Sequence, residues 1–366
     1  MNINTSKFKN IINKAIKACS NNKLFPLTSL VSVNVFGDGF CGLVTYDSTN
    51  LLSVGDYDVY EVSNNDYTDG LVLEAVVSAS QLCALVNKLS TPTINFAIKD
   101  GNLVVTSGRN SYKLPMFYEE GAVVQFPVID IDVSNAESTT INVDSLKLAL
   151  KHNESCAAKT YEVPSLVNAY FGKMIVTSDS IRACFTNVDV FKREVLLPYS
   201  FLKLVNVFDD EFINVVIEGD KILLYTNDCS TSLMGNISDD LESFPIEVLS
   251  KLLEVENTNV IRLVKKELVS CLERFSIFDE NVLNVSIKNN QITFRNGDSA
   301  VETLELSNAS DFEFNVALSS FLPLVRETDG EVINIAYGSN IGVSIINFDE
   351  NENNFVTRIL AFITNE

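Results

Sequence analysis

The sequence predicts an α+β protein in which one unit, a helix followed by a β-hairpin, occurs six times. Three passages alternate hydrophobic and polar residues on both sides of a short polar turn, which is the pattern of a β-hairpin, at 94–110, 213–228 and 283–298. Looser versions of this pattern occur at 30–47, 166–179 and 332–349. A segment with helical spacing of its apolar residues precedes every hairpin, so the chain is predicted to consist of copies of one unit.

Six helical segments are predicted in chain order. In the first, residues 6–20, apolar residues that include Phe8 and Ile12 recur at the spacing of one helix face. The segments Val77-Ser78-Ala79-Ser80 and Val143-Asp144-Ser145 supply N-cap residues for the second and third, because short polar side chains accept hydrogen bonds from the first free N–H groups of a helix. The other five segments span 80–89, 144–155, 199–208, 265–276 and 317–326.

The length and two linking segments predict three domains. A chain of 366 residues corresponds to two or three domains of ordinary size. Segments rich in Asp, Ser and Pro, near 126–138 and 244–258, separate the six units into three pairs. The predicted domains are therefore residues 1–130, 131–250 and 251–366.

The charge of the chain is unevenly distributed along the sequence. Lys and Arg number 27 against 48 Asp and Glu, a formal net charge of −21. An evenly acidic surface would repel nucleic acid. The six helical segments, however, together carry a net charge of +8, so the basic residues gather on the helices. Lysine is also a good helix former, which is the simpler explanation for any single helix.

Several classes of site are excluded by composition. The single histidine, His152, rules out a His-rich metal centre, and we expect a solvent-facing or DNA-facing imidazole there. Seven widely spaced cysteines without a CxxC motif predict reduced, buried thiols, with Cys83 and Cys271 in the core. The acidic groups 209–211 and 239–240 are interpreted as solvated loop residues. We therefore expect no catalytic residues, no metal and no cofactor.

The N-terminal segment and the hydrophobic runs predict a cytoplasmic location. The first 20 residues lack the continuous apolar stretch of a signal peptide. No uninterrupted apolar run approaches the roughly 20 residues that a membrane-spanning helix needs. We expect a cytoplasmic protein without a membrane partner.

Several motifs, in collinear order over nearly the whole chain, resemble one protein family. They are the segment 104–114 (VVTSGRNSYKL), Phe126-Pro127, the segment 23–30, the segment 176–183 (VTSDSIRA) and Phe244-Pro245. In these the sequence resembles the bacterial-type DNA polymerase sliding clamp, the β processivity subunit. It departs from the family at 179–183, where the family usually has Gly-His-Arg-Leu, and in a C-terminal tail that lacks the usual Met-Pro.

The resemblance implies an architecture and a function. In the family three clamp domains form half a ring, two chains close it head to tail, the helices line the hole and the sheets form the outer rim. The implied protein is a non-enzymatic processivity factor of bacterial or infected-host cytoplasm. Its implied partners are double-stranded DNA without sequence preference, a second copy of the chain, and a polymerase and a clamp loader that dock through short linear motifs. Two alternatives are a repeated-β structural protein of a virion or surface and a hydrolase.

The resemblance and the charge pattern together assign residues to three sites. Lysines of the helical segments, and one in the loop after the first helix, are expected to contact DNA: Lys7, Lys9, Lys14, Lys17, Lys23, Lys88, Lys147, Lys151, Lys203, Lys265 and Lys266. The positions that match the family's peptide pocket are Val167, Ser178, Arg182, Ala183, Pro245, Leu249, Ile359, Ala361 and Ile363. The expected dimer interface contains Arg109, Tyr112, Ile277 and Phe278.

Overall fold

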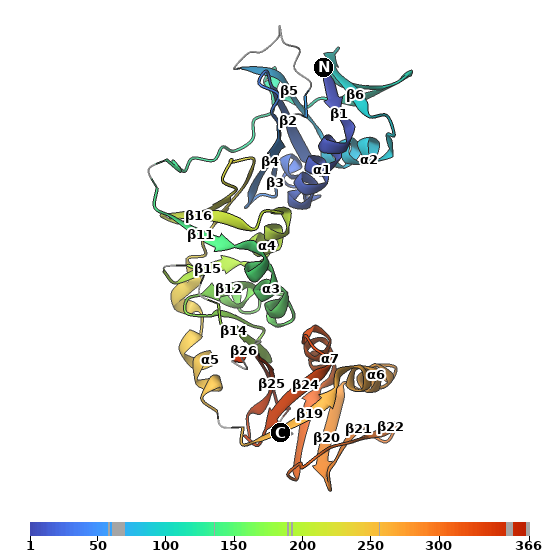
Figure 1. The fold of residues 1–366 in the computed structure, drawn as a ribbon, viewed down its shortest axis with the longest axis vertical. Coiled ribbons are helices and arrows are strands. Elements are labelled where there is room, and N and C mark those ends of the chain that lie inside the picture. Colours follow the sequence, from blue (N-terminus) through green and yellow to red (C-terminus); the bar gives the residue numbers. More distant parts are fainter. Residues whose placement is uncertain are drawn as a thin grey trace. The chain divides into compact units, whose positions relative to one another are not determined.

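A unit of five elements, a strand, a helix and three further strands, is repeated along the chain (Figure 1). The structure is a computed structural model that describes residues 1–57, 59–60, 70–134, 136–188, 190–191, 193–255, 257–348 and 354–363. These residues contain six such units, here called repeats 1 to 6. Each predicted helix and each predicted hairpin is present, which confirms the α+β repeat.

The helices of the six repeats begin close to the predicted residues. They are α1 (Thr5–Ala15), α2 (Ala79–Lys88), α3 (Val143–Asn153), α4 (Tyr199–Lys203), α6 (Lys265–Phe275) and α7 (Leu318–Glu327). Side chains cap α1 and α2: Asn4 accepts from the backbone N–H of Lys7, and Ser78 accepts from that of Gln81. Helices α1 and α4 end earlier than predicted, because short 3₁₀ segments at Ile16–Ala18 and Leu204–Val207 continue them.

Each repeat has three kinds of strand. The hairpins are β2 (Leu30–Phe36) with β3 (Cys41–Tyr46), β6 (Thr93–Lys99) with β7 (Asn102–Ser107), β12 (Asn168–Phe171) with β13 (Ile175–Ser178), β16 (Phe212–Glu218) with β17 (Lys221–Tyr225), β20 (Val282–Lys288) with β21 (Gln291–Asn296), and β24 (Val332–Tyr337) with β25 (Gly342–Phe348). The leading strands, which precede the helices, are β1 (Asn2–Asn4), β5 (Leu71–Ser78), β11 (Ser138–Asn142), β15 (Val195–Pro198), β19 (Asn259–Val264) and β23 (Phe312–Ala317). The closing strands, which follow the hairpins, are β4 (Leu51–Asp56), β8 (Asn110–Pro115), β14 (Arg182–Thr186), β18 (Thr231–Asn236), β22 (Ala300–Glu305) and β26 (Asn354–Ala361). The sequence pattern missed the leading and closing strands as separate elements.

Neighbouring repeats exchange their leading strands. Strand β1 of repeat 1 pairs with β6 of repeat 2, and β5 of repeat 2 pairs with β2 of repeat 1. The same exchange joins β11 to β16 and β15 to β12, and then β19 to β24 and β23 to β20. Repeats 1 and 2, 3 and 4, and 5 and 6 are thus interlocked by backbone hydrogen bonds.

Contacts divide the chain into two compact units. The first comprises Met1–Val143 and Ser200–Ile237, and the second Asp144–Tyr199 and Ser238–Glu366. The first contains the sheets β1-β6-β7-β8 and β11-β16-β17-β18-β4-β3-β2-β5, and the small hairpin of β9 (Tyr118–Glu119) and β10 (Ala122–Val123). The second contains β15-β12-β13-β14-β26-β25-β24-β19 and β22-β21-β20-β23. The division into three domains at 130 and 250 stays a prediction.

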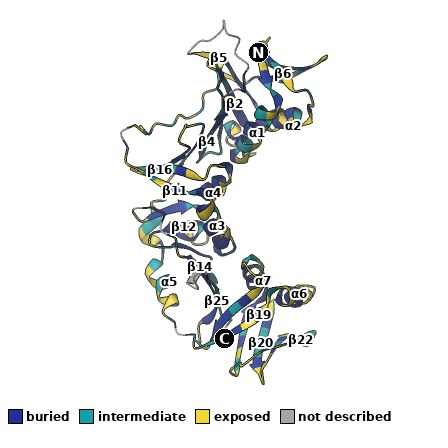
Figure 2. Cartoon of the chain, viewed as in Figure 1, coloured by how far each residue is buried: buried dark blue, intermediate teal, exposed yellow. Residues whose placement is uncertain are grey.

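In the first unit, helices α1 and α2 lie against the sheets through buried apolar side chains (Figure 2). Phe8 of α1 packs edge-to-face on Phe96 of β6, with 5.1 Å between the ring centroids. Ile11 and Ile12 are buried on the same helix face. The predicted apolar face of the first helix is therefore correct.

In the second unit, the eight-stranded sheet carries apolar cores on both of its faces. One core joins Leu268 of α6 and Leu324 of α7 to inward residues of the sheet such as Leu360. The other core lies against a helix that the sequence did not predict, α5 (Ile246–Leu253), which contributes Leu249 and packs with Ile359. Because Leu360 and Ile359 are adjacent in β26, they point to opposite faces. Figure 1 shows α5 on the side of the sheet opposite α3 and α7.

Candidate functional site

Two lysines of α1 hold this helix to neighbouring backbone. Nζ of Lys7 donates to the carbonyl oxygen of Tyr57 at 3.0 Å, and Nζ of Lys9 donates to that of Leu89 at 2.7 Å. Lys7 also lies 3.9 Å from a carboxylate oxygen of Asp56. The charges remain on the helix surface, but their positions are fixed by these contacts.

The other two lysines of α1 contact the segment that follows α4. Nζ of Lys14 lies 2.8 Å from Oδ2 of Asp209, and Nζ of Lys17 donates to the carbonyl oxygen of Asn206 at 3.1 Å. Asp209 belongs to the acidic group 209–211, so one member of this group is ion-paired as well as exposed. The sequence could not indicate this pair, because its partners lie far apart along the chain.

The remaining predicted lysines fall into two groups. Lys151 pairs with Asp329 at 3.0 Å, and Nζ of Lys265 donates to the carbonyl oxygen of Thr328 at 2.6 Å. Lys147 and Lys203 also have interactions with neighbours. By contrast, three lysines are exposed and have no ion pair or hydrogen bond from their side chains within the described parts of the chain: Lys23, Lys88 and Lys266. These three ammonium groups are available to an external anion.

The arginines of α6 and α7 are neutralised locally. Arg274 forms a two-pronged ion pair with Glu302 of β22, and Nη2 of Arg326 lies 2.8 Å from Oε1 of Glu273. The Arg274 guanidinium lowers the pKa of the Glu302 carboxyl. The predicted positive charge of these helices is therefore smaller, at their surface, than a count of residues indicates.

Three residues predicted to line the peptide pocket come together in one apolar cluster. Ala183, Leu249 and Ile359 are all buried and share this cluster with Phe244. Ala183 and Ile359 are direct neighbours on paired strands. Of the remaining predicted positions, Ser178 is buried, and five are half-buried: Val167, Arg182, Pro245, Ala361 and Ile363.

The predicted tail residues are attached to turns that the sequence did not assign to the pocket. The backbone N–H of Ala361 donates to the carbonyl of Ile181 at 3.0 Å, and that of Phe362 donates to Ile341 at 3.0 Å. The backbone N–H of Ile363 donates to Asn315 at 2.8 Å. Ile181 and Ile341 are 50% and 45% exposed, so two bare aliphatic side chains flank this tail. An isoleucine within a predicted turn is the feature of the sequence that could have assigned these two residues to the pocket. The tail residues 364–366 lie outside the described residues.

Arg182 is held by the turn that precedes it. Its Nε donates to Oδ2 of Asp179 at 2.8 Å, and its carbonyl oxygen accepts from the hydroxyl of Ser178 at 2.9 Å. The backbone N–H of Arg182 also donates to Oδ1 of Asp179 at 2.7 Å, so both the side chain and the backbone of Arg182 are held by Asp179. The segment that departs from the family motif is therefore an ordered turn.

Two residues predicted for the dimer interface lie at or beside a sheet edge, and the other two lie in the segment between α6 and β20. Tyr112 belongs to β8, the last strand of its four-stranded sheet, and Arg109 lies in the turn before it. Ile277 is 78% exposed, and Phe278 is also exposed. Strand β22 is an edge of its own four-stranded sheet, and, like the other closing strands, it was not predicted as a separate element.

His152 corrects one expectation. Its side chain is 2% exposed instead of facing solvent. Its Nδ1 lies 2.7 Å from Nη2 of the fully buried Arg358, and its Nε2 lies 3.3 Å from Oδ2 of Asp329. Burial, and then the positive charge of Arg358, lower the pKa of His152 to about 4. The imidazole is therefore neutral, and it links α3, β26 and the segment after α7.

The cysteines follow the prediction with two exceptions. Cys83 and Cys271 are buried, as expected. Cys229 is exposed and Cys19 is half-buried, so the prediction that all the thiols are buried is wrong for these two. Within the described ranges, no group of three His, Cys, Asp or Glu side chains could hold a metal ion.

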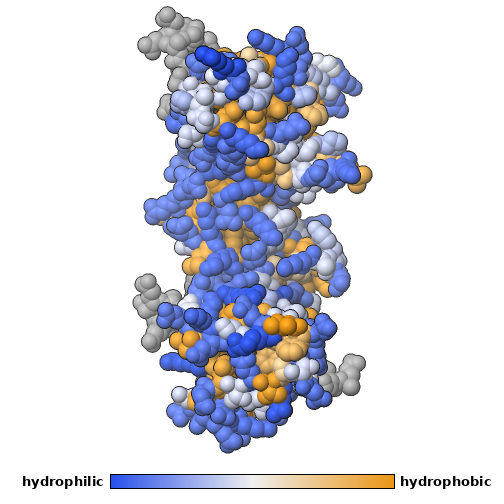
Figure 3. Space-filling view, turned by 90° about the vertical axis from the view of Figure 1, so that its right-hand side faces the viewer, coloured by the Kyte–Doolittle hydropathy of each residue, from blue (hydrophilic) through white to orange (hydrophobic). Residues whose placement is uncertain are grey.

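The molecular surface combines hydrophilic areas with hydrophobic patches. Figure 3 shows both kinds on the face that it presents. Large exposed apolar residues that contribute to the surface include Ile277, Phe278, Val301 and Tyr161. None of the described helices is both long and apolar enough to span a bilayer.

Comparison with known proteins gives a likeness in structure only. No protein-family model and no curated protein matches the sequence. The DNA polymerase III beta subunit of Thermotoga maritima superposes with a TM-score of 0.80 at 17% identity, covering 100% of this chain and 99% of that chain. The DNA polymerase sliding clamp of Bacillus subtilis gives 0.78 at 15% identity, with 100% and 99% covered. The DNA polymerase III subunit beta of Pseudomonas aeruginosa gives 0.82 at 14% identity, with 99% of each chain covered. Over its whole length, the chain has the fold of the bacterial DNA polymerase III beta subunits, the sliding clamps.

Proposed function

We propose that the chain is a DNA polymerase processivity factor, a sliding clamp that encircles duplex DNA and tethers a polymerase to it. The observation that carries the proposal is the likeness in fold to bacterial sliding clamps over 99–100% of both chains. Such a clamp needs no catalytic group. It would act in the cytoplasm of a bacterium or of an infected host cell, with a clamp loader as a further partner.

The pairing of the closing strands supports assembly with a second copy. Closing strand β4 of repeat 1 pairs with β18 of repeat 4, and β14 of repeat 3 pairs with β26 of repeat 6. Each odd repeat thus joins the repeat three places further on. By the same rule, the closing strand of repeat 5 would pair with a repeat three places further on, which this chain does not contain. In a second copy of the chain, that place is taken by repeat 2. Two strands would then meet head to tail, β22 of one chain and β8 of its partner, in a homodimeric ring.

The charges of the two strands favour the same contact between β22 of one chain and β8 of its partner, here called the seam. Arg109 and Lys113 lie in or beside β8, whereas Glu305 lies in β22; Glu302, also in β22, is already paired with Arg274. Opposite charges on adjacent strands stabilise their pairing. An open edge strand also tends to pair with another strand, so a partner at each edge is physically expected. Ile277 and Phe278 supply exposed apolar surface for this interface.

The exposed lysines support contact with DNA that does not depend on sequence. Lys23, Lys88 and Lys266 offer ammonium groups that lack protein partners within the described residues. Ammonium groups bind phosphates without reading bases. A purely structural β-repeat protein, the main alternative, gives no reason for basic residues to gather on helices.

The strand ends around Ile181, Ile341 and the tail support a docking site for short peptides of the polymerase and the loader. The aliphatic surface there is partly exposed and lies beside the buried cluster of Ala183, Leu249 and Ile359. A pocket of this composition takes one or two hydrophobic anchor side chains.

Topology tests the proposed function directly. Protein loaded onto nicked circular DNA should stay bound at a salt concentration that weakens simple phosphate contacts, and should leave after the circle is cut. Equal loss from circular and linear DNA would contradict encirclement.

A further inference from the structure

One face of the eight-stranded sheet in the second compact unit is covered at one end and bare at the other. A row of paired residues crosses all eight strands on this face: Leu196, Tyr170, Val176, Phe185, Thr357, Ile346, Asn334 and Arg262. The first four are buried in the cluster that contains Leu249 of α5. Beyond them, Ile346 and Asn334 are half-buried and Arg262 is exposed.

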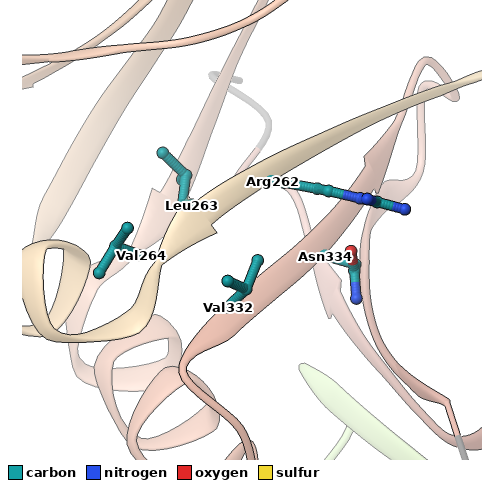
Figure 4. A pocket seen from close by; sticks show the side chains of 5 residues that line it. All are labelled: Arg262, Leu263, Val264, Val332 and Asn334. Carbon is teal, nitrogen blue, oxygen red and sulfur yellow. The ribbon is translucent and has the colours of Figure 1, made fainter.

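The bare end contains a hollow of about 450 Å³, lined by Arg262, Leu263, Val264, Val332 and Asn334 (Figure 4). Two cross-strand pairs form it: Arg262 lies opposite Asn334, and Val264 lies opposite Val332. Val264 and Val332 are 47% and 48% exposed. A polar pair and an apolar pair therefore lie side by side, in a volume that suits a short stretch of peptide.

The guanidinium of Arg262 lacks a partner among the residues that the structure describes. No described residue forms an ion pair or a hydrogen bond with it. In a chain with a net charge of −21, Arg182, Arg274 and Arg326 pair with carboxylates of their own chain, whereas Arg262 leaves its guanidinium to an external carboxylate. The planar guanidinium group matches a carboxylate through two parallel hydrogen bonds. The other four residues that line the hollow are uncharged, whereas binding to a chain of phosphates requires several cations.

The backbone beside the hollow belongs to an edge strand of the described sheet. Strand β19 is the last strand of its sheet and pairs only with β24 among the described strands. Ser310 donates to the side chain of Asn259 at 2.8 Å, so the free stretch begins at Val260. A peptide added along this edge would place alternate side chains beside Val260, Arg262 and Val264.

We propose that the β19 edge and its hollow bind an extended acidic peptide segment of a partner protein. A carboxylate side chain of that segment pairs with Arg262, and apolar side chains two residues before and after it lie on Val260 and on the Val264–Val332 pair. The inference does not rest on the proposed function, since it needs neither DNA nor ring assembly.

The test uses the full chain and a defined probe, the peptide acetyl-Thr-Val-Thr-Asp-Thr-Val-Thr-amide. Titration is followed by NMR of labelled valine methyl groups. We expect the signals of Val264 and Val332 to shift, with a Kd on the order of 0.1–1 mM. Arg262→Glu should weaken binding about tenfold or more, and replacing the peptide's Asp by Asn should do the same.

Arg295→Glu is the matched control. Arg295 is exposed on β21, lacks a described partner and undergoes the same change of charge, so its variant should bind the peptide like the original chain. Both variants should keep the melting temperature of the original chain. Three results would overturn the proposal: binding unchanged in Arg262→Glu, equal binding of the Asn peptide, or equally tight binding at the same methyl groups by inorganic phosphate or a short DNA duplex. The last result would indicate an anion or nucleic-acid site.

Discussion

Arg358 of β26 donates a hydrogen bond of 2.7 Å from its Nη2 to Nδ1 of His152 on α3, and both side chains are buried. Because arginine can only donate, Nδ1 must accept, and the imidazole proton is on Nε2. Nε2 faces Oδ2 of Asp329 at 3.3 Å, and Nη1 of Arg358 donates to Oδ1 of Asn347 at 2.9 Å. The neutral tautomer of His152 is thereby fixed by its two neighbours.

This arrangement predicts a loss of stability in mild acid. Burial and then Arg358 lower the pKa of His152 from 6.5 to about 4, so between these values the unfolded chain binds a proton that the folded chain does not. The contribution of the neutral His152 to the free energy of unfolding is complete above about pH 6.5. It is lost as the pH decreases toward 4, and the total loss from this group is about 3 kcal/mol. Urea unfolding at several pH values between 7 and 4 measures it.

His152→Gln provides the control, since an amide can still accept from Arg358 but does not titrate. The hydrogen bond from Lys151 lowers the pKa of Asp329, which therefore contributes acid sensitivity of its own to both proteins. As the pH falls from 6.5 to 4, the free energy of unfolding should therefore decrease more for the original protein than for the His152→Gln variant. Parallel curves would show that His152 does not titrate in this window.

The exposed lysines are expected to govern DNA affinity. Changing Lys23, Lys88 and Lys266 to Glu should weaken DNA binding and flatten its dependence on salt, because fewer counterions are released. The melting temperature should stay the same, because these side chains have no described partners. Fluorescence anisotropy at several salt concentrations provides the measurement. Lys99→Glu with Lys173→Glu, in exposed hairpin positions, is the control and should bind DNA more tightly than the triple variant.

Lys14→Glu is predicted to behave differently from those lysines. It would place a carboxylate where Lys14 now lies 2.8 Å from Asp209, so the two acids would repel each other. We expect a decrease of about 1 kcal/mol in the free energy of unfolding. Thermal unfolding in parallel with Lys88→Glu, which should be neutral, measures the difference. Equal stability of the two variants would contradict a structural role for Lys14.

The proposed seam predicts a monomeric variant. Tyr112→Asp together with Phe278→Asp introduces buried, unpaired charge at both sides of the contact, so the dimer should dissociate while each chain stays folded. Light scattering during gel filtration gives the mass. Val128→Asp, at a strongly exposed position in a link, is the control and should remain dimeric. A mass of three chains for the original protein, or a dimeric double variant, would contradict the seam.

The proposed peptide site predicts a variant that assembles but does not stimulate a polymerase. Ile181→Ser with Ile341→Ser removes exposed aliphatic surface without touching the core, so stimulation should be lost and stability kept. Deleting residues 361–366 should also abolish stimulation. This deletion should lower stability as well, because Phe362 packs on Phe314 with 5.0 Å between ring centroids. Full stimulation by the double variant would place the docking site elsewhere.

Local patterns were enough to predict the hairpins and the helices of the repeat. The turn signals of 94–110 and the apolar face that contains Phe8 depend only on neighbouring residues. Helix α5 was missed because a Pro and several acidic residues in 244–258 indicate a link, whereas the helix is stabilised by packing of Leu249 on a distant strand. In this segment the tertiary contact stabilises a helix that the local sequence does not favour.

The candidate sites were less predictable because their partners are distant in sequence. Helical spacing in 144–155 could not show that His152 is buried, since Arg358 lies 206 residues further along the chain. In the same way, the residue type of Lys14 is visible in the sequence, but its pairing with Asp209 is not. Charge counts therefore overstated how many cations of the helices are available to an external anion, and the assignment of these helices to DNA contact stays a prediction.

The exchange of leading strands decides which piece of the chain can become an independent folding domain. Asn2 of β1 pairs with Asn95 of β6, so during synthesis the first strand waits until the second hairpin has left the ribosome. Contacts between such distant residues slow folding. A fragment that ends after one repeat would expose a sheet without its outer strand, which invites aggregation. Pairs of repeats are therefore the smallest segments suited to expression as fragments or to reassembly from a split gene.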